Sequence, residues 1–506
     1  MVMAGSGVVR VSEPNPIVRR VGLLVALYAW VFLLRAPMFL RSAVDWDESI
    51  YVLVASQWLH GHLPYTTVFD HKPVGIYAIF RVAFGLFGES IFSIRLMTTV
   101  FVFLTSIALF LLGRQLLSNT MSAVLAAVCY PVFTLGLQGT ASNTELFFIC
   151  FSTFGLHFLL RATSGFQHRN WLYGLAAGLS FGAAFQTKYL VALEIAYFVV
   201  YVLITRYRSL RERPGVLVML ACGAVLPSAL AVGYFWTNDI LQQFVYANVE
   251  ANRRYLSIGS AADVWRGFSH SLQDWIKWTW VTIVCAAWAA SRRGRPPSQR
   301  AANWFLGGWL LVGFLESWFT SRFFNHYYLV TLPPLTLLFA NILAGYRLAI
   351  GNSRAFVLIM AFVLGFPIVR TIEKYYLSWV GSYVTDGDVN TNIARHIRRR
   401  IGPEDYIYIV NGHPIIYFLA GAKLPTRYVL PPMILSPSMS HMAGVEYPAE
   451  VDRILSKEPC FVLVRDEREK NERLSEIIER VKERYVVDTR IDDTTIYLRL
   501  NLNSTR

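Results

Sequence analysis

The feature that most constrains this chain is a series of eleven long apolar segments, spread over most of its 506 residues. Each has roughly the 17 to 25 residues that an α-helix needs to cross a hydrocarbon core. The segments cover about residues 21–40, 91–113, 120–138, 144–160, 171–187, 189–205, 215–236, 273–290, 303–320, 327–345 and 354–372. With 55% hydrophobic and 16% charged residues, the sequence predicts a polytopic α-helical membrane protein with about eleven transmembrane helices.

The arginines predict the orientation of these helices, because positively charged loops stay in the cytoplasm. With the N-terminus inside, the cytoplasmic segments are 1–20, 114–119, 161–170, 206–214, 291–302 and 346–354. They hold 16 Lys and Arg and 2 acids. Their combined charge of +14 therefore equals the net charge of the whole chain. The basic balance is therefore a signal of topology. It points to the lipid bilayer as partner and not to nucleic acid.

The chain divides into three expected regions. Residues 1–20 form a cytoplasmic lead-in, residues 21–372 a transmembrane domain, and residues 373–506 a small soluble α/β domain on the outer face. The last region has strand-like runs at 406–410, 460–464 and 495–500, which alternate with helical runs at 414–421, 449–457 and 467–485. It contains no nucleotide-binding glycine motif. Two sizeable outer loops are expected at 41–90 and 237–272, the second as a flap over a site.

The first outer loop contains an unusual group of carboxylates. Asp45, Asp47 and Glu48 open an apolar-periodic run that includes Tyr51. This pattern predicts a short helix lying on the membrane surface. Asp45 and Glu48 also have the spacing of a capping box, so these two acids could simply start the helix.

The same loop continues into a second polar group, Asp70, His71 and Lys72, followed by Pro73. Proline at the first helical position predicts a helix that begins there. The free backbone amides of that helix would lie beside the lysine. The combination favours an anion.

Further polar residues fall on the outer ends of later spans. They are Glu145, Lys188, Arg322, His326 and Tyr327. Ionisable groups at membrane depth are costly and usually functional. Other interpretations remain: Lys188 and Arg322 could reach lipid headgroups, Glu145 could start a helix, and the His326–Tyr327 pair could belong to an interfacial belt. We expect all of them to line the same outward cavity as Asp47.

An acid beside several cations suits a transfer reaction in which a phosphate leaves. The acid takes a proton from the attacking hydroxyl, and Lys and Arg stabilise the charge that grows on the phosphate oxygens. Because the outer face of a membrane lacks nucleotide sugars, the natural donor there is a lipid-linked phosphosugar.

These motifs resemble a known superfamily. The segments that carry the likeness are DWDESIYVLVASQWLHGHLPY, DHKP, SNTELFF, QTKYL, RFFNHYYLVTLPP and, in the tail, YIYIVNGHPIIYFLAGAKLPTRY. Together they resemble the bacterial polyprenyl-phosphate-sugar glycosyltransferases of the GT-C fold, in particular the rhizobial lipopolysaccharide galacturonosyltransferases. The lipid A aminoarabinose transferases and, further off, the protein O-mannosyltransferases are related to these.

The resemblance implies roles for individual residues. Asp47 would be the catalytic base, Glu48 a supporting acid, and Lys72 a contact to the donor phosphate, with Lys188 and Arg322 as further phosphate-binding candidates. The aminoarabinose enzymes have Glu where this chain has His71. Histidine can also bind a metal, so His71 is a candidate ligand for a divalent ion.

The expected function is therefore transfer of a monosaccharide, with inversion, from a polyprenyl phosphate to an acceptor on the periplasmic face of a bacterial inner membrane. The acceptor would be lipid A or lipopolysaccharide, another envelope glycan or lipid, or a protein. A lipid or glycolipid transporter or flippase is the alternative, although no internal repeat of the kind common in transporters is visible. A polymerase or ligase of whole lipid-linked chains is a third interpretation.

Overall fold

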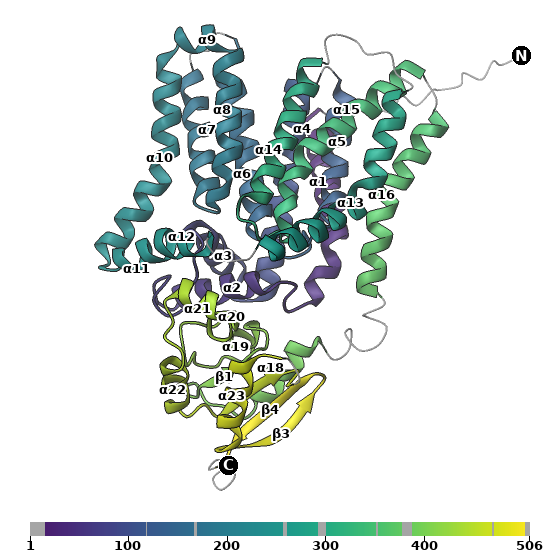
Figure 1. Ribbon diagram of the computed structural model, residues 1–506. Helices are drawn as coiled ribbons and strands as arrows, with labels where there is room; N and C mark the ends of the chain where they lie inside the picture. Colours follow the sequence, from purple (N-terminus) through teal and green to yellow (C-terminus); the bar gives the residue numbers. More distant parts are fainter. Residues whose placement is uncertain are drawn as a thin grey trace, which may run out of the picture.

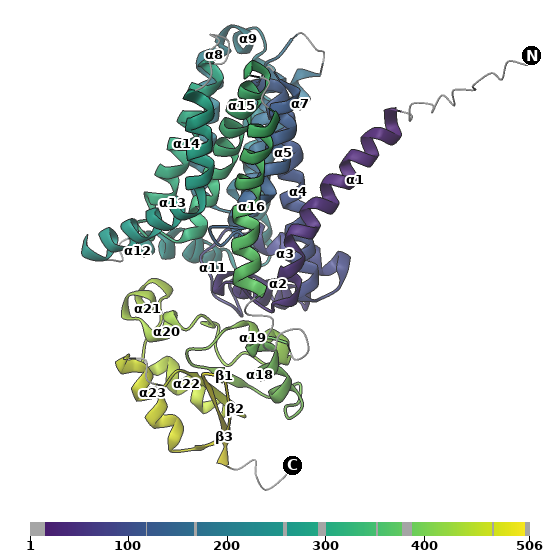
Figure 2. The ribbon, with the colours of Figure 1, turned by 90° about the vertical axis from the view of Figure 1, so that its right-hand side faces the viewer.

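The computed structural model describes residues 16–117, 119–165, 169–256, 261–291, 300–350, 353–376, 387–467 and 470–500. These residues form a bundle of long helices and a smaller α/β region, with short helices between the two (Figures 1 and 2). Most of the expected lead-in 1–20, and the first part of the expected tail at 377–386, lie outside the described residues. The α/β region adjoins one end of the bundle.

A helix coincides with each of the eleven expected spans. These helices are α1 (Pro16–Arg35), α4 (Ile91–Leu116), α5 (Thr120–Phe133), α6 (Thr144–Ala162), α7 (Asn170–Phe185), α8 (Ala192–Thr205), α10 (Pro214–Thr237), α13 (Ala261–Ser291), α14 (Arg300–Phe319), α15 (Leu332–Ile350) and α16 (Ser353–Tyr376). By length and composition, 6 helical segments in the described part of the chain could cross a membrane: Pro16–Leu40, Ile91–Leu116, Thr144–Ala162, Pro214–Thr237, Asn325–Arg347 and Ser353–Glu373. The other five helices are shorter or less apolar. The chain is a multi-pass membrane protein.

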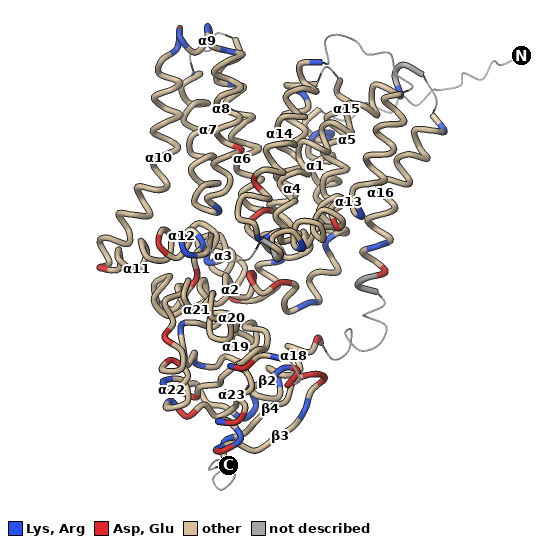
Figure 3. The backbone as a smooth tube through the Cα atoms, in the orientation of Figure 1, with Lys and Arg blue, Asp and Glu red and all other residues tan. Residues whose placement is uncertain are grey.

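Burial separates central from peripheral helices. The apolar window of Asn325–Arg347 is 89% buried, whereas those of α1, α10 and α16 are only 22% buried. The peripheral helices expose large apolar side chains such as Leu23, Val225 and Phe362. Such surfaces are stable against lipid and not against water. At the far end of the bundle, Lys and Arg gather around α9 (Tyr207–Arg211), as the arginine pattern predicts (Figure 3).

The short helices between the two regions come mainly from the two expected outer loops. They are η1 (Ala36–Leu40), α2 (Trp46–Leu59), α3 (Val74–Phe87), α11 (Leu241–Val245), η3 (Tyr246–Glu250) and α12 (Ala251–Leu256). A further 3₁₀ turn, η2 (Tyr189–Val191), precedes α8, and η5 (Asn325–Thr331) precedes α15.

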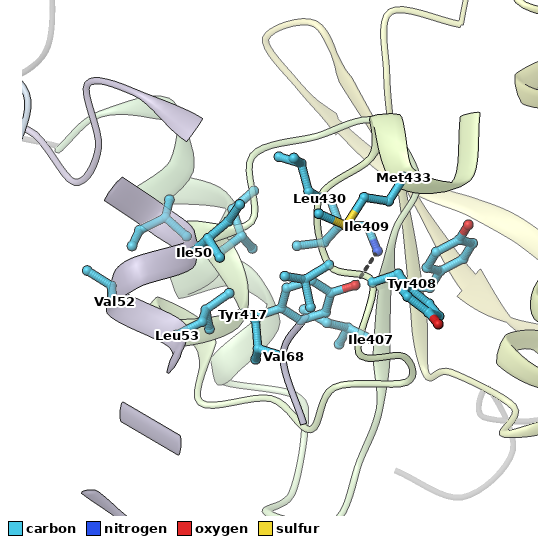
Figure 4. Packing of buried hydrophobic residues seen from close by; sticks show 14 of the residues in the cluster. Ile50, Val52, Leu53, Val68, Ile407, Tyr408, Ile409, Tyr417, Leu430 and Met433 are labelled. Carbon is cyan, nitrogen blue, oxygen red and sulfur yellow. Dashed lines mark hydrogen bonds between the residues drawn. The ribbon is translucent and has the colours of Figure 1, made fainter. Parts of the chain in front are cut away.

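The expected helix after Asp45 is α2, but it has no free apolar face of the kind that a helix on the membrane surface needs. In α2 every residue from Glu48 to Ser56 is buried, so no face of this stretch is free to lie on lipid headgroups. The reason is tertiary: α2 is packed between α3 and the C-terminal region, which covers the face that the sequence pattern left open (Figure 4).

The C-terminal region is a small α/β unit. Its elements are α18 (Val389–Arg398), β1 (Ile407–Ile409), α19 (Ile415–Ala420), α20 (Pro432–Leu435), α21 (Pro437–Ala443), α22 (Ala449–Ser456), β2 (Phe461–Arg465), α23 (Glu472–Lys482), β3 (Tyr485–Ile491) and β4 (Thr494–Arg499). The strand order is β1-β2-β4-β3, with β1 parallel to β2 and the other pairs antiparallel. Sequence analysis missed β3, because this edge strand is polar and mostly exposed and so lacks an apolar run.

One hydrophobic core joins the short helices to this α/β unit. Ile50 and Leu53 of α2 lie in the same buried cluster as Ile407, Tyr417 and Met433 (Figure 4). The hydroxyl of Tyr417 accepts a hydrogen bond of 3.0 Å from the backbone N–H of Ile409, which satisfies the buried phenol. The α/β unit is therefore docked on α2 through a shared core, not tethered at a distance.

Candidate active site

The structure brings the twelve polar residues singled out in the sequence into one network. They lie where the bundle meets the α/β unit, and we call them the charged cluster: Asp45, Asp47, Glu48, Tyr51, Asp70, His71, Lys72, Glu145, Lys188, Arg322, His326 and Tyr327. Residues up to about 280 positions apart in the chain thus meet at one end of the bundle.

Asp47 and Lys72 form the most open pair of the cluster. The Asp47 side chain is 29% exposed, and its Oδ2 atom lies 3.5 Å from Nζ of Lys72. The hydroxyl of Tyr51 donates a hydrogen bond of 3.3 Å to the same oxygen. These contacts are long, so the carboxylate is positioned but keeps room for another partner.

Glu48, next in sequence, is in the opposite situation. It is 2% exposed, and its two oxygens accept hydrogen bonds of 2.8 and 2.6 Å from the guanidinium of Arg95. The backbone N–H groups of Ser142 and Val44 also donate to it. Burial opposes ionisation, but Arg95 and these donors keep the pKa of Glu48 below its usual value. Glu48 therefore ties α2 to α4 and is not available to a substrate, which fits the supporting role that the resemblance implies.

Asp45 does act as a cap. It precedes α2, and its side chain accepts from the backbone of Asp47 in a capping box with Glu48. Its other oxygen accepts a hydrogen bond of 3.1 Å from the amide of Asn143 and lies 3.6 Å from Nδ1 of His326. Asp45 thus combines the helix-starting role with a place in the cluster.

Asp70 and His71 form a buried pair beside Lys72. Both oxygens of Asp70 are occupied, at 2.8 Å each, by the backbone N–H of His71 and the hydroxyl of Tyr77. The His71 ring packs on Tyr255, with 4.8 Å between ring centroids. Burial, followed by the charge of Lys72, holds the pKa of His71 well below its usual value, so this imidazole is neutral at pH 7.

Lys188 and Glu145 form a second buried ion pair. The Lys188 ammonium also lies over the ring of Tyr327, 3.8 Å from its centroid. His326, next to that tyrosine, shares a 3.0 Å hydrogen bond with Gln138. Glu145 does lie in the first turn of α6, as the helix-starting interpretation requires. Its carboxylate, however, pairs with Lys188 of another segment.

Arg322 reaches the cluster from beyond α14. Its guanidinium lies 4.3 Å from the centroid of the Tyr255 ring and donates a hydrogen bond of 2.9 Å to the Tyr255 carbonyl. Its Nε atom is buried and has no hydrogen-bond partner within the described part of the chain. The amide of Asn252, which like Tyr255 belongs to α12, donates a hydrogen bond of 2.9 Å to the carbonyl of His71. Helix α12 therefore lies against the cluster.

A close backbone approach brings the lysines together. Gly75, in the first turn of α3, donates a backbone hydrogen bond of 2.7 Å to the carbonyl of Gln186. A Cβ atom at Gly75 would lie 2.3 Å from that oxygen, so only glycine fits here. Since Lys72 and Lys188 flank these two residues in sequence, the contact holds both ammonium groups near Asp47. Pro73 is the N-cap of α3, so the helix starts at Val74, one residue after the expected start.

The positive charges of the cluster lower the pKa of Asp47. Burial alone would raise this pKa, but the ammonium of Lys72 outweighs burial, and His326, His71 and Lys188 act in the same direction. The pKa is lowered to about 2. The opposite shift affects Lys72: burial would lower its pKa, but Asp47 and Asp70 raise it above its usual range. Asp47 is an anion and Lys72 a cation at all physiological pH values.

These residues do not fit a metal site. Among the described residues no group of three His, Cys, Asp or Glu side chains is placed to hold a metal ion. Both Asp70 oxygens already accept hydrogen bonds, so this carboxylate is not free to join His71 as a second ligand.

Sequence reasoning missed several residues that position the cluster. The clearest is Arg95, which neutralises Glu48, and its location inside an apolar span was a usable signal. Arg35 donates a hydrogen bond of 2.9 Å to the carbonyl of Gly139 and so supports the loop that contains Ser142. Asn143 and Gln138 gave no signal, because uncharged amides in a loop are common.

Comparison with known proteins identifies the architecture. Residues 70–232 match the family described as dolichyl-phosphate-mannose-protein mannosyltransferase. The undecaprenyl phosphate-alpha-4-amino-4-deoxy-L-arabinose arabinosyl transferase of Pseudomonas aeruginosa strain UCBPP-PA14 is 26% identical over 61% of this chain and 57% of its own length. The corresponding transferase 2 of Proteus mirabilis is also 26% identical, over 62% of this chain and 58% of its own length. This chain thus spans less than two thirds of these curated relatives.

Solved structures cover nearly the whole chain. The crystal structure of ArnT from Cupriavidus metallidurans bound to undecaprenyl phosphate has a TM-score of 0.63 at 16% identity, over 95% of this chain and 98% of that one. The apo state of the same protein has a TM-score of 0.64. The resemblance to the GT-C glycosyltransferases is confirmed, and within them to the aminoarabinose transferases. The expected fold class, a helical membrane bundle with a small C-terminal α/β unit, is confirmed as well.

Proposed function

We propose that this chain is an inverting glycosyltransferase that moves one monosaccharide from a polyprenyl-phosphate donor to an acceptor hydroxyl. The observation that carries the proposal is the Asp47–Lys72 pair, in which a partly exposed carboxylate lies 3.5 Å from an ammonium group. The surrounding cluster also supplies the cations of Lys188 and Arg322. The relatives named as transferases of undecaprenyl phosphate aminoarabinose support a polyprenyl-phosphate sugar as donor.

In the proposed reaction Asp47 takes the proton from the acceptor hydroxyl as its oxygen bonds to the anomeric carbon of the sugar. The bond from that carbon to the phosphate oxygen breaks on the opposite side, and polyprenyl phosphate leaves with the electron pair. Lys72, Lys188 and Arg322 stabilise the negative charge on the departing phosphate. The unpartnered Nε of Arg322 is a hydrogen-bond donor suited to this role.

Binding of the donor would also activate the base. In the free protein the pKa of Asp47 is lowered to about 2, which makes the carboxylate a weak base. A donor phosphate that engages Lys72 shares the positive charge that now stabilises Asp47. The pKa of Asp47 then rises, and the carboxylate becomes a better proton acceptor only when the donor is in place.

We infer that the site faces the periplasm of a bacterial inner membrane. The arginine-rich ends of the helices lie at the far end of the bundle from the charged cluster (Figure 3). A periplasmic reporter enzyme fused after Arg506 should be active, and a fusion in the 206–214 loop should be inactive. The opposite pattern would place the site in the cytoplasm and exclude this orientation. The acceptor is an envelope glycan, lipid or protein.

The decisive experiment for the transfer reaction uses purified protein and a polyprenyl-phosphate monosaccharide. We expect release of polyprenyl phosphate in the presence of a cell-envelope acceptor fraction, and none with Asp47→Asn protein. Movement of the intact donor across a vesicle membrane without its cleavage would favour a transporter or flippase. Transfer of preassembled chains but not of single sugars would favour a polymerase or ligase.

A further inference from the structure

A large cleft of about 1440 Å³ lies between α2 and the C-terminal α/β unit, away from the charged cluster. On one side it is lined by the end of α2, including Ser56 and His60, and on the other by α18, α22 and the segment 417–428. The C-terminal unit therefore forms a wall of this cleft in addition to covering α2.

The cleft is strongly basic. Its lining contains five Lys and Arg but only two acids: Arg398, Lys423, Arg427, Arg453 and Lys457 against Glu89 and Glu450. Glu450 pairs with Arg453, and Lys423 pairs with Glu404 outside the lining. Glu89 accepts a hydrogen bond of 2.5 Å from the hydroxyl of Ser56.

Three of these cations form no ion pair within 4.0 Å of a carboxylate among the described residues: Arg398, Arg427 and Lys457. Arg427 lies 4.9 Å from the centroid of the Tyr428 ring, and Lys457 lies 5.1 Å from that of Tyr406. Aromatic faces hold the two cations in place without neutralising them. The cleft thus presents fixed positive charge to whatever occupies it.

Two connections link the walls of the cleft to the proposed site. Ser56 is nine residues beyond Asp47 on α2, which corresponds to about 14 Å along the helix axis. The carbonyl of Arg427 accepts a 2.8 Å hydrogen bond from the backbone N–H of Phe69, directly before the Asp70–Lys72 segment. The walls of the cleft are therefore fixed relative to the base, which lies at the other end of α2.

We propose that this cleft binds an anionic saccharide, bearing phosphate or carboxylate groups, that forms part of the acceptor. Arg and Lys recognise such groups through charge-assisted hydrogen bonds, and the threonine and histidine side chains of the cleft suit sugar hydroxyls. The inference rests on the proposed transferase function and assigns the C-terminal unit a role in acceptor recognition.

Binding is tested with the full-length protein in phosphatidylcholine nanodiscs by titration calorimetry. The probes are a bisphosphorylated N-acetylglucosamine disaccharide and a galacturonic acid trisaccharide, each compared with its uncharged counterpart. We expect each charged probe to bind about tenfold or more tightly than its counterpart, because only the charged probe forms charge-assisted hydrogen bonds with Arg and Lys. Equal binding of charged and uncharged saccharides would overturn the proposal.

The variant Arg398→Gln/Lys457→Gln removes two unpaired cations from the cleft surface. It should weaken binding of the charged probes about tenfold or more. The matched control Arg399→Gln/Arg484→Gln removes two exposed arginines that do not line the cleft, and it should bind like the unchanged protein. Similar losses in both pairs would show only a general effect of charge and would contradict a specific site.

Two further arms separate the possible causes of failure. Asp47→Asn protein should bind the charged saccharides normally, since Asp47 does not line the cleft. Cleavage of the donor with this variant tests the transferase function independently of saccharide binding. Dihexanoyl phosphatidylglycerol tests for a bilayer headgroup as the ligand: if it binds to the cleft and the charged saccharides do not, the acceptor proposal is wrong.

Discussion

The two sides of the first turn of α2 hold neighbouring carboxylates in contrasting surroundings. On one side Glu48 is 2% exposed and bound by the guanidinium of Arg95 and by backbone donors. On the other side Asp47 is 29% exposed, with only long contacts to Lys72 and Tyr51. Two acids that look equivalent in the sequence are therefore divided between holding the fold and remaining available.

This difference teaches that a structural acid is distinguished from a reactive one less by its charge than by whether its carboxylate oxygens already accept hydrogen bonds. A carboxylate whose lone pairs are all occupied has none left for a substrate proton. A carboxylate with only long contacts to an ammonium group keeps its charge and can exchange partners. The following changes are chosen to break or sharpen this contrast.

The largest effect is expected from Glu48→Ala. It leaves Arg95 as a buried charge without its carboxylate partner, and breaking a buried pair in this way costs about 3–5 kcal/mol. Thermal unfolding of the purified protein in detergent should shift to clearly lower temperature. Arg95→Leu combined with Glu48→Leu is the matched control, because removing both charges should restore much of the loss. An unchanged unfolding temperature in Glu48→Ala would contradict the structural role.

Asp47→Asn should affect turnover and leave the fold intact. The amide keeps the size of the side chain but cannot accept the proton, so turnover should fall by roughly 10²-fold, about 2.7 kcal/mol in the barrier. Donor binding and the unfolding temperature should remain close to those of the unchanged protein. Near-normal transfer by well-folded Asp47→Asn protein would exclude Asp47 as the base and leave Asp45 and Glu145 as candidates.

Lys72→Met should weaken donor binding and turnover together. The lysine charge acts on the phosphate both before and during the reaction, so its removal costs binding in both states. We expect about a tenfold loss of donor affinity, which corresponds to about 1.4 kcal/mol, with a further loss in turnover. Titration with polyprenyl phosphate measures the first effect and initial rates the second. A change in turnover alone would show that Lys72 does not contact the donor.

The same variant should change the pH dependence. In the unchanged protein Asp47 is ionised above its pKa of about 2, so it causes no loss of kcat/KM between pH 5 and pH 8. Without the Lys72 charge, burial dominates and the pKa of Asp47 rises. The base is then protonated as the pH falls, and activity of Lys72→Met should drop on the acidic side at a higher pH than before. Parallel pH profiles of the two proteins would contradict this electrostatic link.

The smallest effect is expected at a carboxylate outside the cluster. Asp388 caps α18 and accepts hydrogen bonds of 2.8 and 2.7 Å from the backbone and hydroxyl of Ser42. Asp388→Ala should cost about 1 kcal/mol of stability, as typical for a lost cap, and leave turnover unchanged. A lower unfolding temperature with normal turnover would show that Asp388, like Glu48, is a structural acid. Loss of turnover without loss of stability would contradict the distinction between structural and reactive acids.

The sequence by itself determined the membrane helices and the set of polar residues that meet at one end of the bundle. These features depend on the length and hydrophobicity of continuous segments and on the end of each segment at which a polar residue lies. Five residues of the charged cluster could be found because each is a polar group at the end of an apolar span: Glu145, Lys188, Arg322, His326 and Tyr327. The other seven stand out as polar groups within the otherwise apolar 41–90 segment.

Only the tertiary structure decided which of these groups is satisfied and which is free. The pairing of Glu48 with Arg95 and that of Lys188 with Glu145 depend on contacts between segments far apart in the chain. The same holds for the burial of α2 by the C-terminal unit, the edge strand β3 and the basic cleft. Local patterns state where a charge is located along the chain. Its partner, and therefore its chemistry, is set by the close approach of distant segments, which no local pattern records.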